Sequence, residues 1–267
     1  MIKYIFSANP GRAGSGYLSV LFRHAANVAA FHEPEPIMNR LPMIEFLNGR
    51  PSLMEALMPE KLSAIRRALM APNQVYAETN HTFIRGFGWL LPKTIPEGEI
   101  GVVILRRNRD AVARSLHRIQ VNAFNNGGRG WLIHVNAKNK IVPPPDDVPL
   151  LLPRYYYYRF LHRIYYFAKA RPRLTLGMFK EREEPRTPYE LNIKLLRWYV
   201  DEVYALTEKY RRTFPGIRYY EVSTEDLNDL PTVLDMFGHF GLEAKESLDS
   251  VVGTPVNTKP EYGPATG

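Results

Sequence analysis

The beginning of the chain places a strand, a glycine-rich loop and a helix in direct succession. Residues 2–7 form a short apolar run rich in β-formers, which predicts a buried strand, and residues 16–29 carry leucine, phenylalanine and alanine at helical spacing. The glycines of the intervening loop (SANPGRAGSGYL, 7–18) allow backbone N–H groups to converge on an anion at a helix N-terminus. The loop is therefore a candidate anion site; the plainer alternative is a turn that only connects the two elements.

Strand and helix patterns alternate through most of the remaining chain. Further strands are predicted at 28–33, 74–79, 100–105 and 217–222. Helices are predicted at 60–70 after Pro59, and at 110–121, 187–212 and 230–240. This alternation indicates an α/β fold with a mainly parallel sheet covered on both faces. Periodicity breaks down over residues 122–186, which we interpret as an insertion or lid within a single domain spanning residues 1–267.

Composition excludes several kinds of site. The chain has no cysteine, so disulfides, thiolate metal sites and cysteine nucleophiles are ruled out. Its net charge of +8 favours anionic partners, namely nucleotides, nucleic acid or a membrane surface. The N-terminus lacks a signal-peptide pattern, and no apolar run approaches the roughly 20 residues that span a bilayer. A cytoplasmic location without a membrane span is expected.

The glycine-rich loop does not have the composition of an ATP-binding loop. A Walker A loop requires a lysine followed by serine or threonine, whereas the cation of this loop is Arg12. The strand predicted at 100–105 is followed by Arg106 and Arg107, where an ATPase would carry an aspartate that helps to hold magnesium. These residues indicate an anion held without metal, unless the arginines are simply solvated.

The motifs resemble those of the 3′-phosphoadenosine 5′-phosphosulfate (PAPS)-dependent sulfotransferases. The family's 5′-phosphosulfate loop has the form [RK]-[SA]-G-[TS]-[TS]-x-L. The corresponding run here is Arg12, Ala13, Gly14, Ser15, Gly16, Tyr17 and Leu18. The family's 3′-phosphate element is an arginine with a serine eight residues later, as in Arg107 and Ser115. A late Tyr-Glu pair near the adenine pocket is similar to Tyr220-Glu221, and the C-terminal VNTK (256–259) lies where the family often closes over the 3′-phosphate.

This resemblance implies a three-layer, doubly wound sheet of the P-loop type with a helical or loop insertion. It also implies PAPS as co-substrate, 3′,5′-adenosine diphosphate (PAP) as product, and no metal. Residues 12–17 would hold the 5′-phosphosulfate, Arg107 and Ser115 the 3′-phosphate, Tyr220 the adenine, and Lys259 would close the site. Gly16 departs from the family pattern, which has a hydroxyl residue there, and Arg106 is an alternative to Arg107.

The acceptor must lose a proton, and candidate bases follow two of the predicted strands. His32 and Glu33 come after the second strand, and Glu78 and His81 lie at the end of the third. Carboxyl ends of neighbouring parallel strands face the nucleotide in a doubly wound sheet. Glu33 is the preferred base because FHEP (31–34) resembles the element that carries the glutamate base of carbohydrate and tyrosyl sulfotransferases. His81 is the rival, since the small-phenol type uses a histidine after the third strand.

An aromatic-basic stretch over residues 154–171 (RYYYYRFLHRIYYFAKAR) has three possible roles. It could stack on nucleic-acid bases or sugars, contact a membrane surface, or form the acceptor pocket or its lid. The commonest explanation is a helix that packs its rings on the core and leaves its arginines solvated. We expect a small-molecule or glycan acceptor and no nucleic acid. The competing functions are a kinase-like phosphotransferase with a degenerate loop and a non-enzymatic binder of nucleic acid or anionic surfaces.

Overall fold

A computed structural model describes residues 1–69, 75–121, 128, 130–145, 148–171 and 189–254 of the 267-residue chain. Its centre is one five-stranded parallel sheet with the strand order β2-β3-β1-β4-β5. The strands are β1 (Tyr4–Ala8), β2 (Val28–His32), β3 (Val75–Thr79), β4 (Ile100–Arg106) and β5 (Arg218–Ser223). The predicted α/β fold with a doubly wound parallel sheet is confirmed, and each predicted strand is present within about two residues of its expected bounds.

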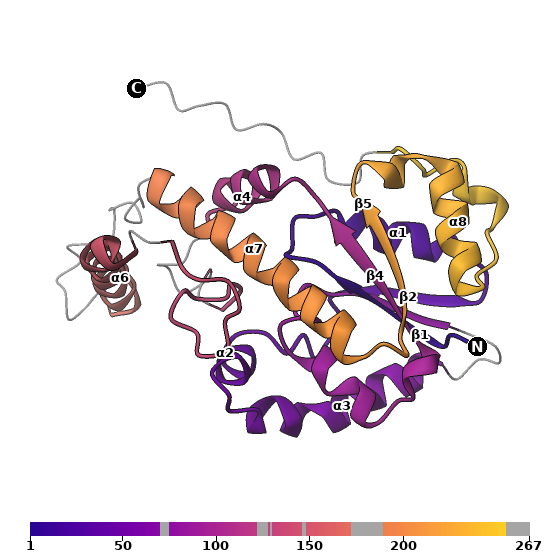
Figure 1. Cartoon of the computed structure of the whole chain (residues 1–267), viewed down its shortest axis with the longest axis horizontal. Coiled ribbons are helices and arrows are strands. Elements are labelled where there is room, and N and C mark those ends of the chain that lie inside the picture. The colour runs from indigo at the N-terminus through magenta and orange to yellow at the C-terminus, as the bar shows by residue number, and fades with distance from the viewer. Residues whose placement is uncertain (70–74, 122–127, 129, 146–147, 172–188, 255–267) are drawn as a thin grey trace.

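Helices cover both faces of the sheet, which gives three layers (Figure 1). The helices of the described residues are α1 (Ser15–Arg23), α2 (Leu41–Leu47), α3 (Ser52–Ala68), α4 (Arg109–Arg118), α6 (Val148–Ala170), α7 (Tyr189–Thr213) and α8 (Leu230–Phe240), of which α6 lies away from the sheet. On one side of the sheet Phe22 of α1 stacks on Phe237 of α8, with ring centroids 6.2 Å apart. On the other side Tyr210 of α7 packs edge-on against Phe83 at 5.5 Å. Among the described residues, no helix is long and apolar enough to cross a membrane.

The order of the strands determines where a site can form. β1 lies in the middle of the sheet, between β3 and β4, and both β1 and β4 are almost wholly buried. The chain leaves β1 through α1 toward the β2 edge and later returns to build β4 and β5 on the opposite side. The winding direction therefore reverses at β1, and the crevice beyond the carboxyl end of such a strand is where open α/β sheets bind ligands.

Two predicted helix boundaries are wrong. The first helix ends at Arg23 instead of continuing to residue 29, because the chain must turn back to pair β2 with β3, beginning at Val28 and Val75. The helix predicted to start at residue 60, after Pro59, begins eight residues earlier at Ser52, so this proline lies inside α3. The first turns of α3 bury Met54 and Met58 on the stripe that continues to Lys61 and Ile65, and this packing holds the helix together across the missing proline N–H. α2 was not predicted.

Candidate active site

The loop between β1 and α1 turns sharply because three of its residues adopt left-handed backbone conformations. Gly11, Arg12 and Gly14 have φ angles of 76°, 55° and 83°. Gly14 is the N-cap of α1, and among the described residues no side chain caps this helix start, which leaves its first N–H groups available to a ligand. A Cβ on Gly14 would lie 2.7 Å from the Cγ2 atom of Thr224, so the close approach of the loop to this residue requires glycine.

A cavity of about 790 Å³ opens at this loop. The loop and α4 contribute one part of its wall, and the residues that follow β2 and β3 contribute another. The predicted site residues in the wall are Arg12, Gly14, Ser15, Gly16, Tyr17, His32, Glu33, His81, Arg107 and Ser115. Residues from widely separated parts of the chain thus meet at the crevice that the strand order predicts.

The cavity wall carries positive charge from four arginines: Arg12, Arg107, Arg114 and Arg118. Arg12 donates from Nε to Ser115 Oγ at 3.1 Å, and Arg107 donates from Nη1 to the backbone oxygen of Arg12 at 2.8 Å. Burial, together with the charges of Arg107 and Arg118, lowers the pKa of Arg12. The Nε of Arg107 is buried and forms no hydrogen bond with a described residue, although Glu225 lies 3.8 Å away. A bound anion would relieve both the repulsion between the cations and this unsatisfied donor.

Arg107, rather than Arg106, faces the cavity. Arg106 hydrogen-bonds Glu208 and donates to Glu221 at 3.0 Å, and its guanidinium lies over the Tyr204 ring. These contacts hold the Arg106 side chain away from the wall. α4 begins directly after this turn, where the side chain of Asn108 accepts hydrogen bonds from two backbone N–H groups of the first turn.

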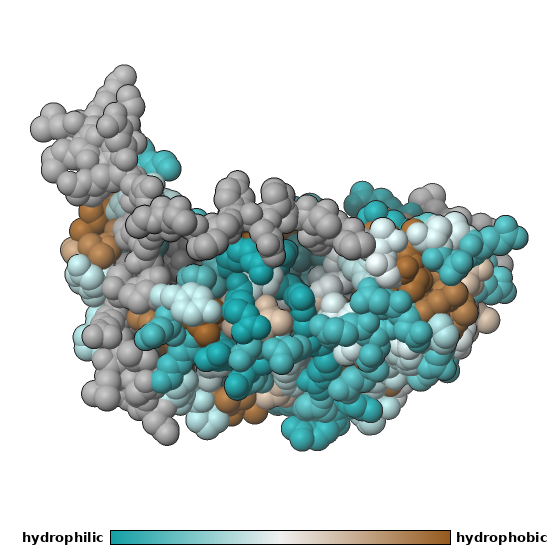
Figure 2. Space-filling view, turned by 90° about the horizontal axis from the view of Figure 1, so that it is seen from above, coloured by the Kyte–Doolittle hydropathy of each residue, from teal (hydrophilic) through white to brown (hydrophobic). Residues whose placement is uncertain are grey.

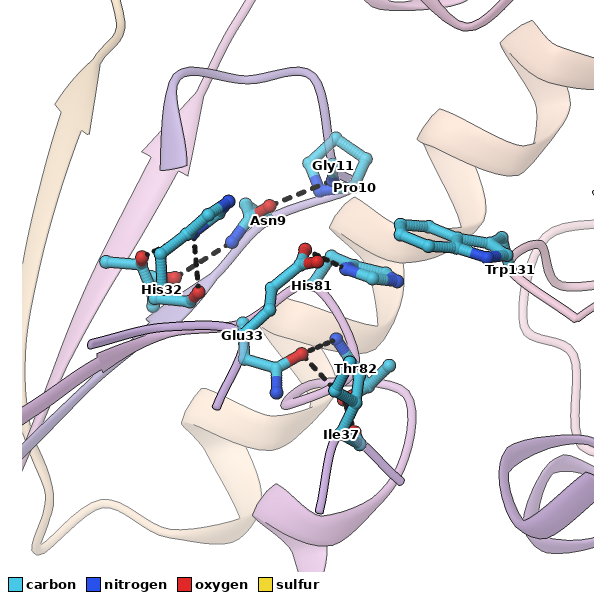
Figure 3. Close-up of polar contacts among 12 residues, drawn as sticks. Asn9, Pro10, Gly11, His32, Glu33, Ile37, His81, Thr82 and Trp131 are labelled. Atoms are coloured by element: carbon cyan, nitrogen blue, oxygen red, sulfur yellow. Dashed lines mark hydrogen bonds and ion pairs between the residues drawn. The ribbon is translucent and has the colours of Figure 1, made fainter. Parts of the chain in front are cut away.

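Glu33 and His81 form a hydrogen-bonded pair on the other side of the cavity (Figure 3). The Nδ1 of His81 lies 2.5 Å from Oε1 of Glu33, and the His81 ring stacks on Trp131 with centroids 4.3 Å apart. Burial and the nearby charge of Arg85 lower the pKa of His81 to about 4, despite the opposing effect of Glu33. Burial alone would raise the pKa of Glu33, but the hydrogen bond from His81, together with the electrostatic effect of His81, His32 and Arg85, outweighs it and lowers that pKa. At neutral pH the pair is therefore a carboxylate that accepts from the Nδ1–H of a neutral imidazole.

The exposure of the two partners differs. The Glu33 side chain is 20% exposed and that of His81 only 2%. The Nε2 of His81 is buried and has no hydrogen-bond partner among the described residues. Glu33 is held in place by its backbone, whose N–H donates to the oxygen of Thr79 at 3.1 Å while its own φ of 49° turns the chain out of β2. The carboxylate therefore offers the more accessible proton-accepting atom.

Behind this pair lies a fully buried arginine that the sequence did not reveal as a site residue. Arg85 donates from Nε to the backbone oxygen of His81 at 2.8 Å and from Nη1 to that of Trp131. Its guanidinium lies 5.4 Å from the ring centroid of Tyr199, whose hydroxyl donates to the backbone oxygen of Pro10 at 2.7 Å. Arg85 thus connects the loop after β3 with α7 and, through Tyr199, with the glycine-rich loop. The only sequence signal was a lone cation in the apolar run TFIRGFGW (82–89).

The other two candidate bases are engaged elsewhere. Glu78 is fully buried and lies outside the cavity wall, with Oε1 accepting from Lys61 Nζ at 2.7 Å and from Asn80 at 2.8 Å. Its Oε2 accepts from Tyr76 at 2.7 Å. Both of its carboxylate oxygens are therefore engaged within the core. His32 lines the cavity, but its Nδ1 already contacts the hydroxyl and backbone oxygens of Thr79 at 2.9 and 3.1 Å.

Two further predicted residues, Tyr220 and Ala13, are not part of the wall. Tyr220 points toward α8, where its hydroxyl donates to Asp235 at 2.8 Å, because alternation along β5 turns it away from the face that α7 covers. Ala13 is buried, and its backbone oxygen accepts from the Thr224 hydroxyl at 2.8 Å. Lys259 and the rest of VNTK (256–259) lie outside the described residues. Of the expected insertion over 122–186, Trp131 and Leu132 line the cavity.

Comparisons with known proteins identify similar structures at low sequence identity. No protein-family model and no curated protein matches the chain. The structure is similar to the sulfotransferase domain from the curacin biosynthetic pathway, with 12% identity and a TM-score of 0.46 over 93% of this chain and 77% of that one. It is also similar to the sulfotransferase domain from the Synechococcus PCC 7002 olefin synthase, with 14% identity and a TM-score of 0.48 over 97% of this chain and 80% of that one.

Proposed function

We propose that this chain is a sulfotransferase that moves the sulfuryl group of PAPS onto a hydroxyl or amine of a small-molecule or glycan acceptor, without metal. One observation carries the proposal: Arg12, Arg107 and Ser115 meet beside a glycine-rich helix start in the same cavity wall as a carboxylate–histidine pair. The first group is suited to an anionic donor, and the second to removing a proton from an acceptor.

The cavity residues fit a nucleotide that carries two separate anionic groups. The uncapped start of α1 and the guanidinium of Arg12 suit the 5′-phosphosulfate, and the Gly14 turn lets the backbone come close to it. Arg107 has a buried Nε without a hydrogen-bond partner among the described residues, and the neighbouring Ser115 hydroxyl accepts a hydrogen bond from Arg12. These two residues are suited to the 3′-phosphate, which distinguishes PAPS from ATP.

The acceptor attacks the sulfur of PAPS in line, the bond from sulfur to the 5′-phosphate oxygen breaks, and PAP leaves. Charge grows on the leaving oxygen, and Arg12 with the N–H groups at the start of α1 stabilises it. Glu33 accepts the proton of the attacking hydroxyl or amine at its accessible oxygen. His81 holds the other oxygen through Nδ1, so it acts as a positioning residue that keeps the carboxylate ionised and directed into the cavity.

The acceptor would approach from the segment between α4 and α7. Trp131 and Leu132 of this segment line the same cavity as Glu33, and the Trp131 ring covers His81. An aromatic face beside the base is suited to orienting a ring or a sugar. This supports the proposal that residues 122–186 are an acceptor-site insertion in a single sulfotransferase-like domain 1–267.

The deciding experiment is a thermal-shift comparison of PAP, ATP and ATP with magnesium. PAP should stabilise the protein without metal, by about 2.7 kcal/mol at 100 times its dissociation constant. Arg107→Ala should weaken PAP far more than adenosine 5′-phosphosulfate, which has no 3′-phosphate, whereas equal weakening would remove Arg107 from the 3′ site. Stabilisation by ATP–magnesium but not by PAP would replace this function with that of a kinase-like phosphotransferase. Steeply salt-dependent anion binding without preference for PAP would indicate a non-enzymatic binder.

A further inference from the structure

The surface of α6 carries an aromatic face that the proposed function does not use. Among the described residues, five of the twelve exposed large hydrophobic side chains belong to this one helix, each between 37% and 60% exposed. They are Tyr156, Tyr157, Phe160, Ile164 and Phe167, and we call them the outer face of α6. Single exposed apolar residues are ordinary on protein surfaces, but a group of large ones along one helix indicates a binding surface.

A different side of the helix is buried by packing within the chain. His162, Tyr165 and Ala168 are buried, and they repeat at intervals of three residues along one side of α6. The helix expected over this stretch is present, but no described side chain of α6 belongs to the buried cluster around the sheet, and its outer face is exposed. Figure 1 shows α6 at the end of the molecule away from the strands, and Figure 2 shows hydrophobic side chains gathered at that same end.

The charge of α6 has one sign. The helix sequence contains Arg154, Arg159, Arg163 and Lys169 and no aspartate or glutamate, and Arg171 follows directly. Arg163 and Lys169 are exposed. The guanidinium of Arg171 lies 4.9 Å from the ring centroid of Phe167, so cation and aromatic ring form one surface. An occupant that complements this surface must be apolar and anionic together.

A bilayer interface has this combination, and its geometry also fits. A single helix presents a convex ridge, which can lie along a flat membrane with its rings among the acyl chains and its cations at the phosphates. Nucleic-acid bases stack on aromatic rings within a groove that tracks the backbone. The cations exclude burial across the bilayer, so the helix would lie in the interfacial plane. We propose that the outer face of α6 docks the protein on membranes that contain anionic phospholipids.

The test uses the full chain and vesicles of phosphatidylcholine with or without phosphatidylserine, separated by flotation. The wild-type protein should float with the phosphatidylserine vesicles and much less with pure phosphatidylcholine. Phe160→Ser/Phe167→Ser should weaken this binding at least roughly tenfold, since two large rings leave the interface. Arg163→Gln/Arg171→Gln, which removes two exposed cations, one of them on the Phe167 ring, should weaken binding to the anionic vesicles by roughly tenfold or more.

Leu53→Ser/Leu234→Ser is the matched control, because it removes two exposed leucines from α3 and α8 and should bind vesicles as the wild type does. Melting temperatures of all variants should agree within a few degrees, since no buried side chain is changed. Equal flotation with both lipid compositions, no flotation, or unchanged flotation of the Phe160/Phe167 variant would each overturn the proposal. Binding of a homopolymeric RNA that needs the outer face, without vesicle binding, would assign this surface to nucleic acid instead.

Discussion

The Nδ1 atom of His81 lies 2.5 Å from a carboxylate oxygen of Glu33, across a sequence separation of 48 residues. The sheet produces this contact: His32 at the end of β2 pairs with Thr79 at the end of β3, so the residues that follow these strands emerge side by side. Both side chains were candidates for the base when only the sequence was considered. In the structure they are partners, and their contributions must be separated by experiment.

The first prediction separates these two roles. Glu33→Gln keeps the shape of the side chain but cannot accept a proton, so turnover should fall by about 10²–10⁴ with little change in PAP affinity. His81→Ala should retain more activity, and the acid limb of its kcat/KM profile should move to higher pH. The reason is that loss of the His81 hydrogen bond leaves burial to raise the pKa of Glu33. If only His81→Ala abolishes turnover while both variants bind PAP, the base is His81.

The second prediction concerns stability against pH. The pKa of His81 is lowered from 6.5 to about 4, chiefly by burial and then by Arg85, so at pH 5 the unfolded chain binds a proton at this residue and the folded chain does not. The stabilisation is therefore complete above about pH 6.5 and declines as the pH falls toward 4. Between pH 7 and 5 the wild type should lose about 2 kcal/mol more unfolding free energy than His81→Gln.

Urea denaturation at several pH values measures this difference. His239→Gln, which removes an exposed histidine of α8, is the matched control and should follow the wild type. Parallel curves for the wild type and His81→Gln would show that His81 is not held neutral by its surroundings.

The third prediction concerns the cation of the glycine-rich loop. Arg12→Ala should lower turnover by roughly 10²–10³, the usual cost of losing one transition-state donor. Arg12→Lys should retain part of the activity, because a point charge persists without the planar fork that contacts Ser115. Arg66→Ala removes an exposed arginine of α3 and should leave turnover unchanged. Full turnover in steady-state assays of Arg12→Ala would show that the loop only connects β1 to α1.

Local sequence patterns predicted the elements better than their arrangement. β4 was predictable because its apolar run (IGVVIL, 100–105) fits only a buried central strand. The N-terminal turns of α3 were missed because Pro59 suggests a helix start, whereas the burial of Met54 and Met58 continues the helix through it. The order of the strands follows from long-range pairing, which no local pattern encodes.

The candidate site likewise contains residues that a local motif predicted and residues that only long-range contacts bring together. Arg107 and Ser115 were predicted from their resemblance to the sulfotransferase 3′-phosphate motif, and both line the cavity. Arg85 and Trp131 were missed because their roles arise from contacts between distant segments, in which Arg85 donates to the backbone of Trp131 behind His81. Tyr220 was placed near the nucleotide by analogy, but its position along β5 directs it to α8.

The last prediction tests the turn that brings the loop to the cavity. Gly14 has a φ of 83°, and an added Cβ would lie 2.7 Å from Cγ2 of Thr224. That side chain cannot turn away without losing the hydrogen bonds of its hydroxyl to the backbone oxygens of Ala13 and Arg106. Gly14→Ala should therefore lower the unfolding free energy by about 1–3 kcal/mol and weaken PAP binding.

A double variant separates the two causes of this loss. Gly14→Ala/Thr224→Ser removes the clashing methyl group and keeps the hydroxyl. It should therefore recover the loss of unfolding free energy that the clash causes. The loss of roughly 1–2 kcal/mol caused by the left-handed backbone of an alanine should remain. Gly98→Ala is the control, because a Cβ at Gly98 meets no atom of the chain within 4 Å. Thermal unfolding with and without PAP measures both effects. If Gly14→Ala were as stable as Gly98→Ala and bound PAP equally well, the loop would not depend on this close approach, and its part in holding the donor would have to be abandoned.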